Sequence, residues 1–152
     1  MNGQGADHGP GADRVALRCG DWAALGEAAA LVRTEVFIVE QAIAPALEWD
    51  DDDAASLHCV AFEGDRPVAC GRLLPDGRIG RMAVLKPWRG RGLGGAILER
   101  LVEAARSRGD AVATLSAQCH AEGFYRAHGF APDGAVFDDA GIAHLPMRRA
   151  LR

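Results

Sequence analysis

The sequence predicts an α/β (α+β) domain in which a mixed, mostly antiparallel twisted sheet of about seven strands carries helices on both faces. Two observations predict this class. Strand patterns joined by tight turns follow one another in the middle of the chain, as they do in an antiparallel meander. Helical patterns alternate with the remaining strands, and their apolar faces need a sheet to cover. With 152 residues, the chain is long enough for one domain with a buried core.

The N-terminal part predicts a leader, a strand and a helix. Residues 1–13 contain glycine, alanine, aspartate and proline but no hydrophobic segment, so we expect a disordered leader and no signal peptide. The segment from Arg14 to Cys19 alternates as a strand does. Asp21 is a suitable N-cap for a helix that begins at Trp22. An irregular stretch, Phe37 to Ser56, follows this helix.

The middle of the chain predicts three antiparallel strands. Leu57 to Glu63 and Arg66 to Leu73 flank Gly64-Asp65, a two-residue turn of the kind that hairpins prefer. Pro75-Asp76-Gly77 then turns the chain into the strand Arg78 to Leu85.

The C-terminal half predicts two more helices and three more strands. In chain order they are the helix Ala96 to Arg108, the buried strand Ala111 to Ser116, a short helix from about His120 to His128, and a last hairpin about Asp138-Asp139 formed by Phe130 to Phe137 and Ile142 to Arg149.

Composition excludes several classes of function. The net charge of −4 argues against a general nucleic-acid binder, because no basic surplus is available to displace counterions. No apolar run approaches the ~18–20 residues that a membrane span needs. We therefore expect a cytoplasmic protein without a nucleic-acid or membrane partner.

The four cysteines are expected to be free thiols. They form no Cys-x-x-Cys pair, so neither a zinc site nor a thioredoxin-like motif is indicated, and we predict no metal. Pairing Glu63 with Arg66 across the hairpin turn and counting outward places Cys59 opposite Cys70, close enough to touch. We expect this pair to stay reduced, because a cytoplasmic setting disfavours disulfides.

A glycine-rich segment, Arg89-Gly90-Arg91-Gly92-Leu93-Gly94-Gly95, joins the third meander strand to the next helix. Glycine lets the backbone turn sharply and approach a ligand. The helix N-terminus presents unpaired N–H groups and the positive end of its dipole to the same place. Such a segment holds an anion, typically a phosphate, and Arg89 and Arg91 can add charge-assisted hydrogen bonds. We therefore predict a phosphorylated cofactor.

Three ligand-binding patterns compete for this segment. The P-loop is excluded, because it needs a Gly-Lys-Ser/Thr ending that is absent. Gly90-x-Gly92-x-x-Gly95 matches the dinucleotide fingerprint, but that site follows the first strand of a parallel unit and needs an acid at the end of the next strand. Here Asp110 precedes that strand. In the third pattern, Arg/Gln-x-x-Gly-x-Gly/Ala, the positions are filled by Arg89, Gly92 and Gly94. A glycine-rich turn without a ligand is the remaining alternative.

The third pattern resembles the acyl-CoA segment of the Gcn5-related N-acetyltransferases (GNAT). The order strand, helix, three strands, helix, strand, helix, two strands is the topology of this family, so the resemblance covers residues 14–152 as a single domain. Three stretches resemble its ElaA-like branch: residues 33–41, Glu48-Trp49-Asp50 before His58, and Ser116-Ala117-Gln118 ahead of Gly123-Phe124-Tyr125.

The resemblance implies that acetyl-CoA and a primary amine meet in a ternary complex and that the amine attacks the thioester directly. The backbone amides from Arg89 to Gly95 would surround the pyrophosphate. The backbone of Met82, Ala83 and Val84 would pair with the pantetheine, in a slot left where the strands of Val84 and Leu115 splay apart. A backbone N–H near Ala83 or Val84 would stabilise the oxyanion.

Tyr125, the only tyrosine of the chain, is the predicted general acid. It lies where the family places a hydroxyl near the CoA sulfur, and a phenol pKa of ~10 keeps the proton available at neutral pH. The alternative is a core aromatic residue with its hydroxyl at the surface.

The general base is left open among four residues near the expected acceptor side: Glu40, Glu48, Asp50 and His58. Each has a plainer interpretation, as a solvated or capping charge or as a hydrogen-bonded strand residue. If the acidic run from Asp50 to Asp53 lines the acceptor cleft, it would attract cationic amines.

Two other functions remain as alternatives to the acetyltransferase. One is a catalytically inactive CoA-binding module that serves as a sensor or interaction partner, and the other is a dinucleotide-binding protein. The acceptor, on a small molecule or a protein, is left open, as is the choice between a monomer and a homodimer.

Overall fold

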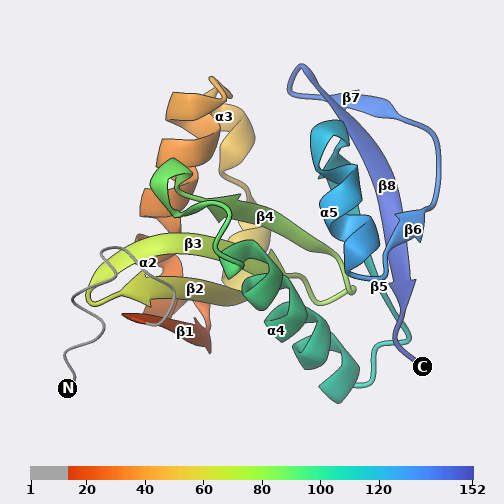
Figure 1. Ribbon diagram of the computed structural model, residues 1–152, viewed down its shortest axis with the longest axis horizontal. Coiled ribbons are helices and arrows are strands. Elements are labelled where there is room, and N and C mark those ends of the chain that lie inside the picture. Colours follow the sequence, from red (N-terminus) through yellow and green to blue (C-terminus); the bar gives the residue numbers. More distant parts are fainter. Residues whose placement is uncertain (1–13) are drawn as a thin grey trace.

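The computed structural model describes residues 14–152, so the predicted leader lies outside the described part of the chain. Eight strands form two sheets there (Figure 1). The first sheet is antiparallel, and its strands follow in chain order: β1 (Val15–Gly20), β2 (Leu57–Glu63), β3 (Arg66–Leu73) and β4 (Ile79–Val84).

The second sheet is built around β8 (Ile142–Ala150). β5 (Val112–Gln118) pairs with one edge of β8, and the short strands β6 (Ala131–Pro132) and β7 (Phe137–Asp139) pair with the other. The predicted α/β class is confirmed, with eight strands in place of about seven.

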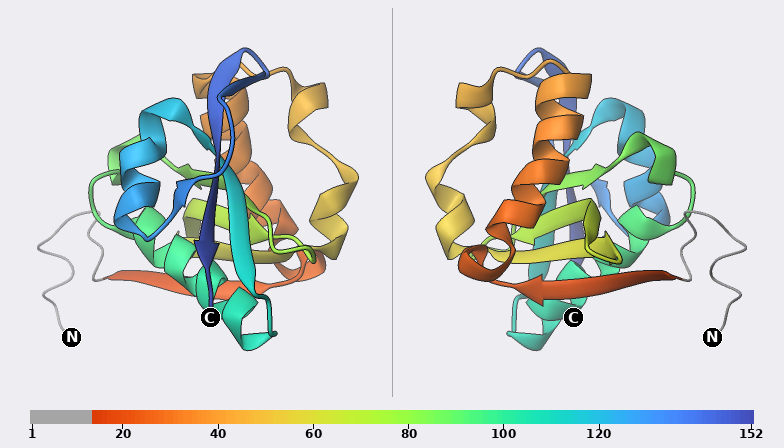
Figure 2. Two further views of the ribbon diagram at one scale, coloured as in Figure 1. Left: turned by 90° about the vertical axis from the view of Figure 1, so that its right-hand side faces the viewer. Right: turned by 90° about the vertical axis from the view of Figure 1, so that its left-hand side faces the viewer.

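Helices cover both faces of the first sheet, as predicted (Figure 2). α2 (Trp22–Arg33) lies on one face and α4 (Leu93–Ser107) on the other, while α5 (Glu122–Ala127) lies beside the second sheet. No helix within residues 14–152 is long and apolar enough to cross a membrane.

The stretch predicted as irregular contains short helical segments instead. They are the π-helical Thr34–Glu40, the single turn α3 (Pro45–Glu48) and the 3₁₀ segment Asp51–Ala55. Two further 3₁₀ segments, Lys86–Trp88 and Cys119–Ala121, lie later in the chain. The π-helical segment continues α2 directly.

Local signals fix the two long helices. The Asp21 carboxylate accepts a hydrogen bond from the Ala24 amide at 2.9 Å and caps α2, as predicted. The apolar stripe of α4 is fully buried, each residue being 0% exposed: Ile97, Leu98, Leu101, Val102 and Ala105. Burying one such leucine contributes roughly 1.5–3 kcal/mol. α4 begins at Leu93 and not at Ala96, because Gly92 (φ 83°) makes the turn into the helix.

The predicted cysteine register is wrong. Glu63 pairs with Arg66 as expected, but a β-bulge at Ala61/Phe62 shifts the rest of the hairpin. Pro67 lies at this bulge, where a residue without an amide N–H is tolerated. Cys59 therefore lies opposite Gly71, and all four cysteines are free thiols.

The last hairpin also differs from the prediction. Asp138 and Asp139 belong to β7, and the turn is made by Ala140-Gly141. Both turn residues have positive φ, 54° and 80°, which the two-residue hairpin turn requires and glycine adopts without strain.

Candidate active site

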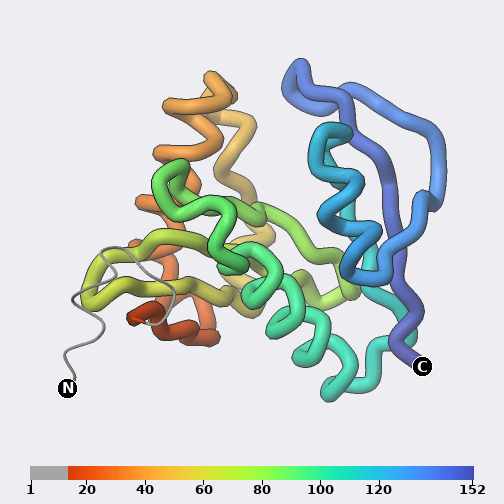
Figure 3. The backbone as a smooth tube through the Cα atoms, in the orientation of Figure 1, coloured from red at the N-terminus to blue at the C-terminus, as the bar shows by residue number. Residues whose placement is uncertain are grey.

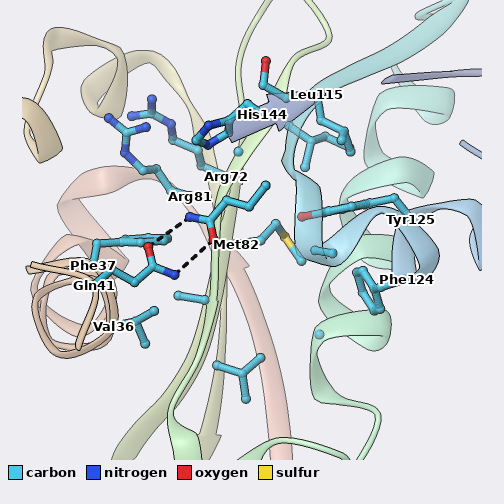
Figure 4. A pocket seen from close by; sticks show the side chains of 18 of the residues that line it. Val36, Phe37, Gln41, Arg72, Arg81, Met82, Leu115, Phe124, Tyr125 and His144 are labelled. Atoms are coloured by element: carbon cyan, nitrogen blue, oxygen red, sulfur yellow. Dashed lines mark hydrogen bonds between the residues drawn. The ribbon is translucent and has the colours of Figure 1, made fainter. Parts of the chain in front are cut away.

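A cavity of about 1200 Å³ lies between the two sheets. β4 and β5 meet through one isolated parallel bridge, Arg78 to Thr114, and then diverge as the arms of a V (Figure 3). Val84 and Leu115, whose strands were expected to splay apart, both line this cavity. We call the space between β4 and β5 the slot; it is shown in Figure 4.

The glycine-rich segment lines one end of the slot. Gly90 and Gly92 have positive φ, 79° and 83°, which other residues adopt only with strain. The first intrahelical hydrogen bond of α4 runs from the Ala96 amide to the Gly92 carbonyl at 3.0 Å. The amides of Leu93 and Gly94 therefore precede the helical ladder, and no side chain caps them. This geometry can hold an anion.

Arg89 fastens this segment to the π-helical segment. Its guanidinium donates two hydrogen bonds to the Glu40 carboxylate, at 2.8 and 2.7 Å, and its Nε donates to the Val84 carbonyl at 2.9 Å. Arg91 does not line the slot; its guanidinium lies 5.3 Å from the centroid of the Trp88 ring. Arg89 is thus engaged with Glu40 and Val84, and the backbone amides are the groups of this segment that can bind an anion.

A β-bulge in β4 faces the slot. Cys70 pairs with Ala83 and Arg72 with Gly80, so Arg81 and Met82 share the place opposite Gly71. Arg81 has φ 50°, a left-handed conformation that costs roughly 1–2 kcal/mol in a residue with a side chain. Bulges interrupt the ladder of hydrogen bonds and occur next to active sites. Met82, Ala83 and Val84 all line the slot.

Tyr125 points from α5 into the slot (Figure 4). Its side chain is 9% exposed, and its ring makes edge-to-face contacts with Phe124 and Phe130, with centroids 5.0 and 6.1 Å away. The hydroxyl has no hydrogen-bond partner among the described residues. Burial raises the pKa of Tyr125 to about 12, so the phenol keeps its proton at neutral pH.

Three acids in or near the acidic run, Glu48, Asp50 and Asp53, enter a largely buried ion-pair network with arginines. Glu48 accepts from Arg33 at 2.8 Å, and Asp53 accepts from Arg33 and Arg72, both at 2.8 Å. Asp50 pairs with Arg72 at 2.8 Å and with Arg81 at 3.2 Å. Three arginines thus face three carboxylates.

The position of the acidic run does not meet the condition under which it would attract cationic amines to the acceptor cleft. None of the residues from Asp50 to Asp53 lines the cavity, although Asp51 and Asp52 have no arginine partner among the described residues. Arg72 and Arg81, which contact Asp50, line it instead (Figure 4).

The four base candidates have different surroundings. Glu40 lines the cavity, and its hydrogen bonds to Arg89 lower its pKa. Glu48 lines it too, but burial raises the pKa of Glu48 against the opposing effect of its arginine partners. His58 lies outside the cavity, 1% exposed, with its Nε2 2.9 Å from the Asp53 carbonyl oxygen. Burial lowers the pKa of His58, which favours a neutral structural ring.

The structure therefore brings most predicted site residues to one cavity and leaves three outside it. Those that line it are Glu40, Glu48, Met82, Ala83, Val84, Arg89, Gly90, Gly92, Leu93, Gly94, Gly95 and Tyr125. Those outside it are Asp50, His58 and Arg91.

Sequence reasoning missed an amide pair across the slot. The amide of Gln41 donates to Gln118 at 3.1 Å, and that of Gln118 donates to Gln41 at 2.9 Å (Figure 4). The pair joins the residue that directly follows the π-helical segment to the last residue of β5. Both residues occur in the stretches that resemble the ElaA-like branch, which was the available signal.

Asp50 predicts a pH dependence of stability. Its hydrogen bonds to Arg72 lower the pKa of Asp50 from 3.8 to about 2. Because the folded state holds the carboxylate charged, this contribution to stability is present above pH 3.8 and is lost as the pH falls to about 2. Urea unfolding between these pH values should therefore show a shallower pH dependence in Asp50→Asn, which retains a capping oxygen for Asp52. Equal slopes in the two proteins would contradict the assignment.

Comparison with known proteins agrees with this geometry. The family described as Acetyltransferase (GNAT) domain matches residues 23–151. The Bacillus subtilis (strain 168) protein YjcF, named an uncharacterized N-acetyltransferase, is 39% identical over 122 residues, which are 78% of this chain and 87% of that protein.

Two solved structures are also similar. An acyl-CoA N-acyltransferase from Pseudomonas aeruginosa has a TM-score of 0.80 and 34% identity, over 90% of this chain and 99% of that one. ElaA from Escherichia coli has a TM-score of 0.80 and 28% identity, over 88% of this chain and 99% of that one.

Proposed function

Since the chain belongs to the GNAT acetyltransferase family, we propose that it transfers the acetyl group of acetyl-CoA to a primary amine of a small molecule or a protein. One observation carries this proposal. The slot joins the free amides at the start of α4 to the hydroxyl of Tyr125, so one extended thioester can contact both. The amine attacks the thioester directly in a ternary complex.

The chain's own groups supply binding and charge stabilisation. The amides at Gly92 to Gly95 hold the pyrophosphate, helped by the dipole of α4. The backbone from Met82 to Val84 pairs with the pantetheine arm as an added strand. A backbone N–H near Ala83 or Val84 stabilises the oxyanion, an interaction worth roughly 3–4 kcal/mol where single donors have been removed.

Two proton transfers complete the reaction. The ammonium group of the acceptor must lose a proton before it attacks. We propose that water carries this proton from the ammonium to Glu48. Both candidate bases in the cavity pair with arginines, but the pKa of Glu40 is lowered by Arg89, whereas burial raises the pKa of Glu48. When the carbon–sulfur bond breaks, the Tyr125 hydroxyl gives its proton to the departing thiolate.

The test is CoA release from acetyl-CoA with a panel of primary amines, compared with spontaneous hydrolysis. Chromatography should follow the CoA, because the protein's own free thiols react with thiol dyes. We expect amine-dependent release and an acetylated product of matching mass.

Two outcomes would contradict the proposal that the protein is an acetyltransferase. Calorimetric binding of acetyl-CoA without turnover of any amine would indicate an inactive CoA-binding module. A rise in melting temperature with NADH but not with acetyl-CoA would indicate a dinucleotide-binding protein.

A further inference from the structure

Two cysteines lie side by side at the edge of the first sheet away from the slot. Cys19 of β1 pairs directly with Cys59 of β2, and Cys59 pairs with Gly71 of β3. Directly paired residues of neighbouring strands point to the same face of a sheet. β1 and β4 are opposite edges of this sheet, so the pair is separate from the slot beside β4.

The pair lies on the face that α4 covers. A Cβ built on Gly71 would lie 3.0 Å from both Ile97 and Leu101 of that helix, which identifies the face. From the same helix, Nη1 of Arg100 lies 3.9 Å from the Cys19 sulfur. A guanidinium at this position stabilises a thiolate.

The two thiols differ in access and in ionisation. Cys19 is exposed, whereas Cys59 is 0% exposed. A hydrogen bond from Cys59 and the charge of Arg100, the two ionisable groups that act on Cys19, lower the pKa of Cys19 to about 6 against the effect of its partial burial. The same contact and burial raise the pKa of Cys59. Cys70, fully buried, has its pKa raised to about 12 and is inert by comparison.

We propose that Cys19 and Cys59 form a thiol-modification site, in which Cys19 attacks a low-molecular-mass disulfide and Cys59 resolves the product. The Cys19 thiolate attacks one sulfur of the disulfide, forms a mixed disulfide and expels one small thiolate. The Cys59 sulfur then attacks the Cys19 sulfur and expels the second small thiolate, which takes up the proton that Cys59 releases. Two protein thiols are oxidised, and one small disulfide is reduced to two thiols.

The register permits this bond. Paired residues of antiparallel strands have Cα atoms about 4.5–5.5 Å apart, within the range of about 4.4–6.8 Å found for disulfides. The order of attack follows from access, because the buried Cys59 cannot meet an external disulfide before Cys19 has done so. The half-buried Cys119 lies in the 3₁₀ segment Cys119–Ala121, outside the strands, and is a free thiol.

The experiment treats the reduced full-length protein with oxidised glutathione and maps the peptides by mass spectrometry. We expect a Cys19–Cys59 disulfide in the wild type and a glutathione adduct on Cys19 in Cys59→Ser. Alkylation of Cys19 as a function of pH should give an apparent pKa near 6, so at pH 6 the thiol should react about tenfold faster than an unstructured cysteine peptide. In Arg100→Met the apparent pKa should rise.

A stable glutathione adduct on Cys19 of the wild type, without the Cys19–Cys59 link, would overturn the resolving role. No reaction at Cys19 would overturn the whole proposal. The wild-type map decides both points even if Cys59→Ser does not fold, and neither outcome bears on the acetyltransferase assay.

Discussion

Gly94→Asp is expected to weaken acetyl-CoA binding at least about 100-fold, which corresponds to ~2.7 kcal/mol, while Gly94→Ala binds nearly as well as the wild type. Gly94 lies in the first turn of α4 and lines the slot. A Cβ there would lie 3.6 Å from both Phe124 and Val84, an ordinary contact distance, so alanine fits. Aspartate adds a negative charge where the pyrophosphate should meet the helix N-terminus.

Gly94→Asp should reduce the affinity for acetyl-CoA without reducing the stability of the fold. A carboxylate in the first turn of a helix is favoured by the helix dipole, by roughly 0.3–1 kcal/mol. The melting temperature of Gly94→Asp should therefore stay the same or rise, while calorimetry shows loss of acetyl-CoA affinity. A folded variant that keeps its affinity would show that this segment does not hold the pyrophosphate.

Gly92 offers a second pair of variants for the same site. Because Gly92 has φ 83°, any side chain there adds strain, and asparagine tolerates that conformation best. Gly92→Asn and Gly92→Asp differ by a charge at nearly constant shape. Only the aspartate variant should lose acetyl-CoA binding beyond the shared effect of strain.

Local sequence signals predicted the parts of this fold that local forces determine. The cap at Asp21, the turn at Gly64-Asp65 and the apolar stripe of α4 each depend on residues within a few positions of one another. The glycine-rich segment was found in the same way, since Gly90 and Gly92 do adopt the positive φ that only glycine adopts freely.

Contacts between residues far apart in the sequence determined the features that local signals did not predict. The bulge at Ala61/Phe62 shifts the cysteine register by one residue. No sequence pattern near the hairpin turn indicates this bulge. Glu48, Asp50 and Asp53 are paired because α2, β3 and β4 each supply an arginine. His58 pointed away from the cavity, against Trp22, with ring centroids 4.9 Å apart. The spacing of residues along the chain does not indicate these contacts.

Tyr125→Phe is expected to lower turnover by about 10², the low end of the range of about 10²–10⁴ for one acid–base group. The change removes one hydroxyl and keeps the ring that packs against Phe124 and Phe130. Because that hydroxyl has no hydrogen-bond partner in the described residues, its loss should not reduce the free energy of unfolding. Acetyl-CoA affinity should also survive.

The loss should appear in kcat more than in KM, because the hydroxyl acts only as the carbon–sulfur bond breaks. A thiol pKa of ~8.5 makes thiolate a tolerable leaving group without help, which explains the modest size of the effect. An acetyl thioester of a more acidic aryl thiol needs still less protonation, so the deficit of Tyr125→Phe should shrink with that substrate. A variant with full activity toward acetyl-CoA, or a deficit equal for both thioesters, would leave Tyr125 as a packing residue and the acid unassigned.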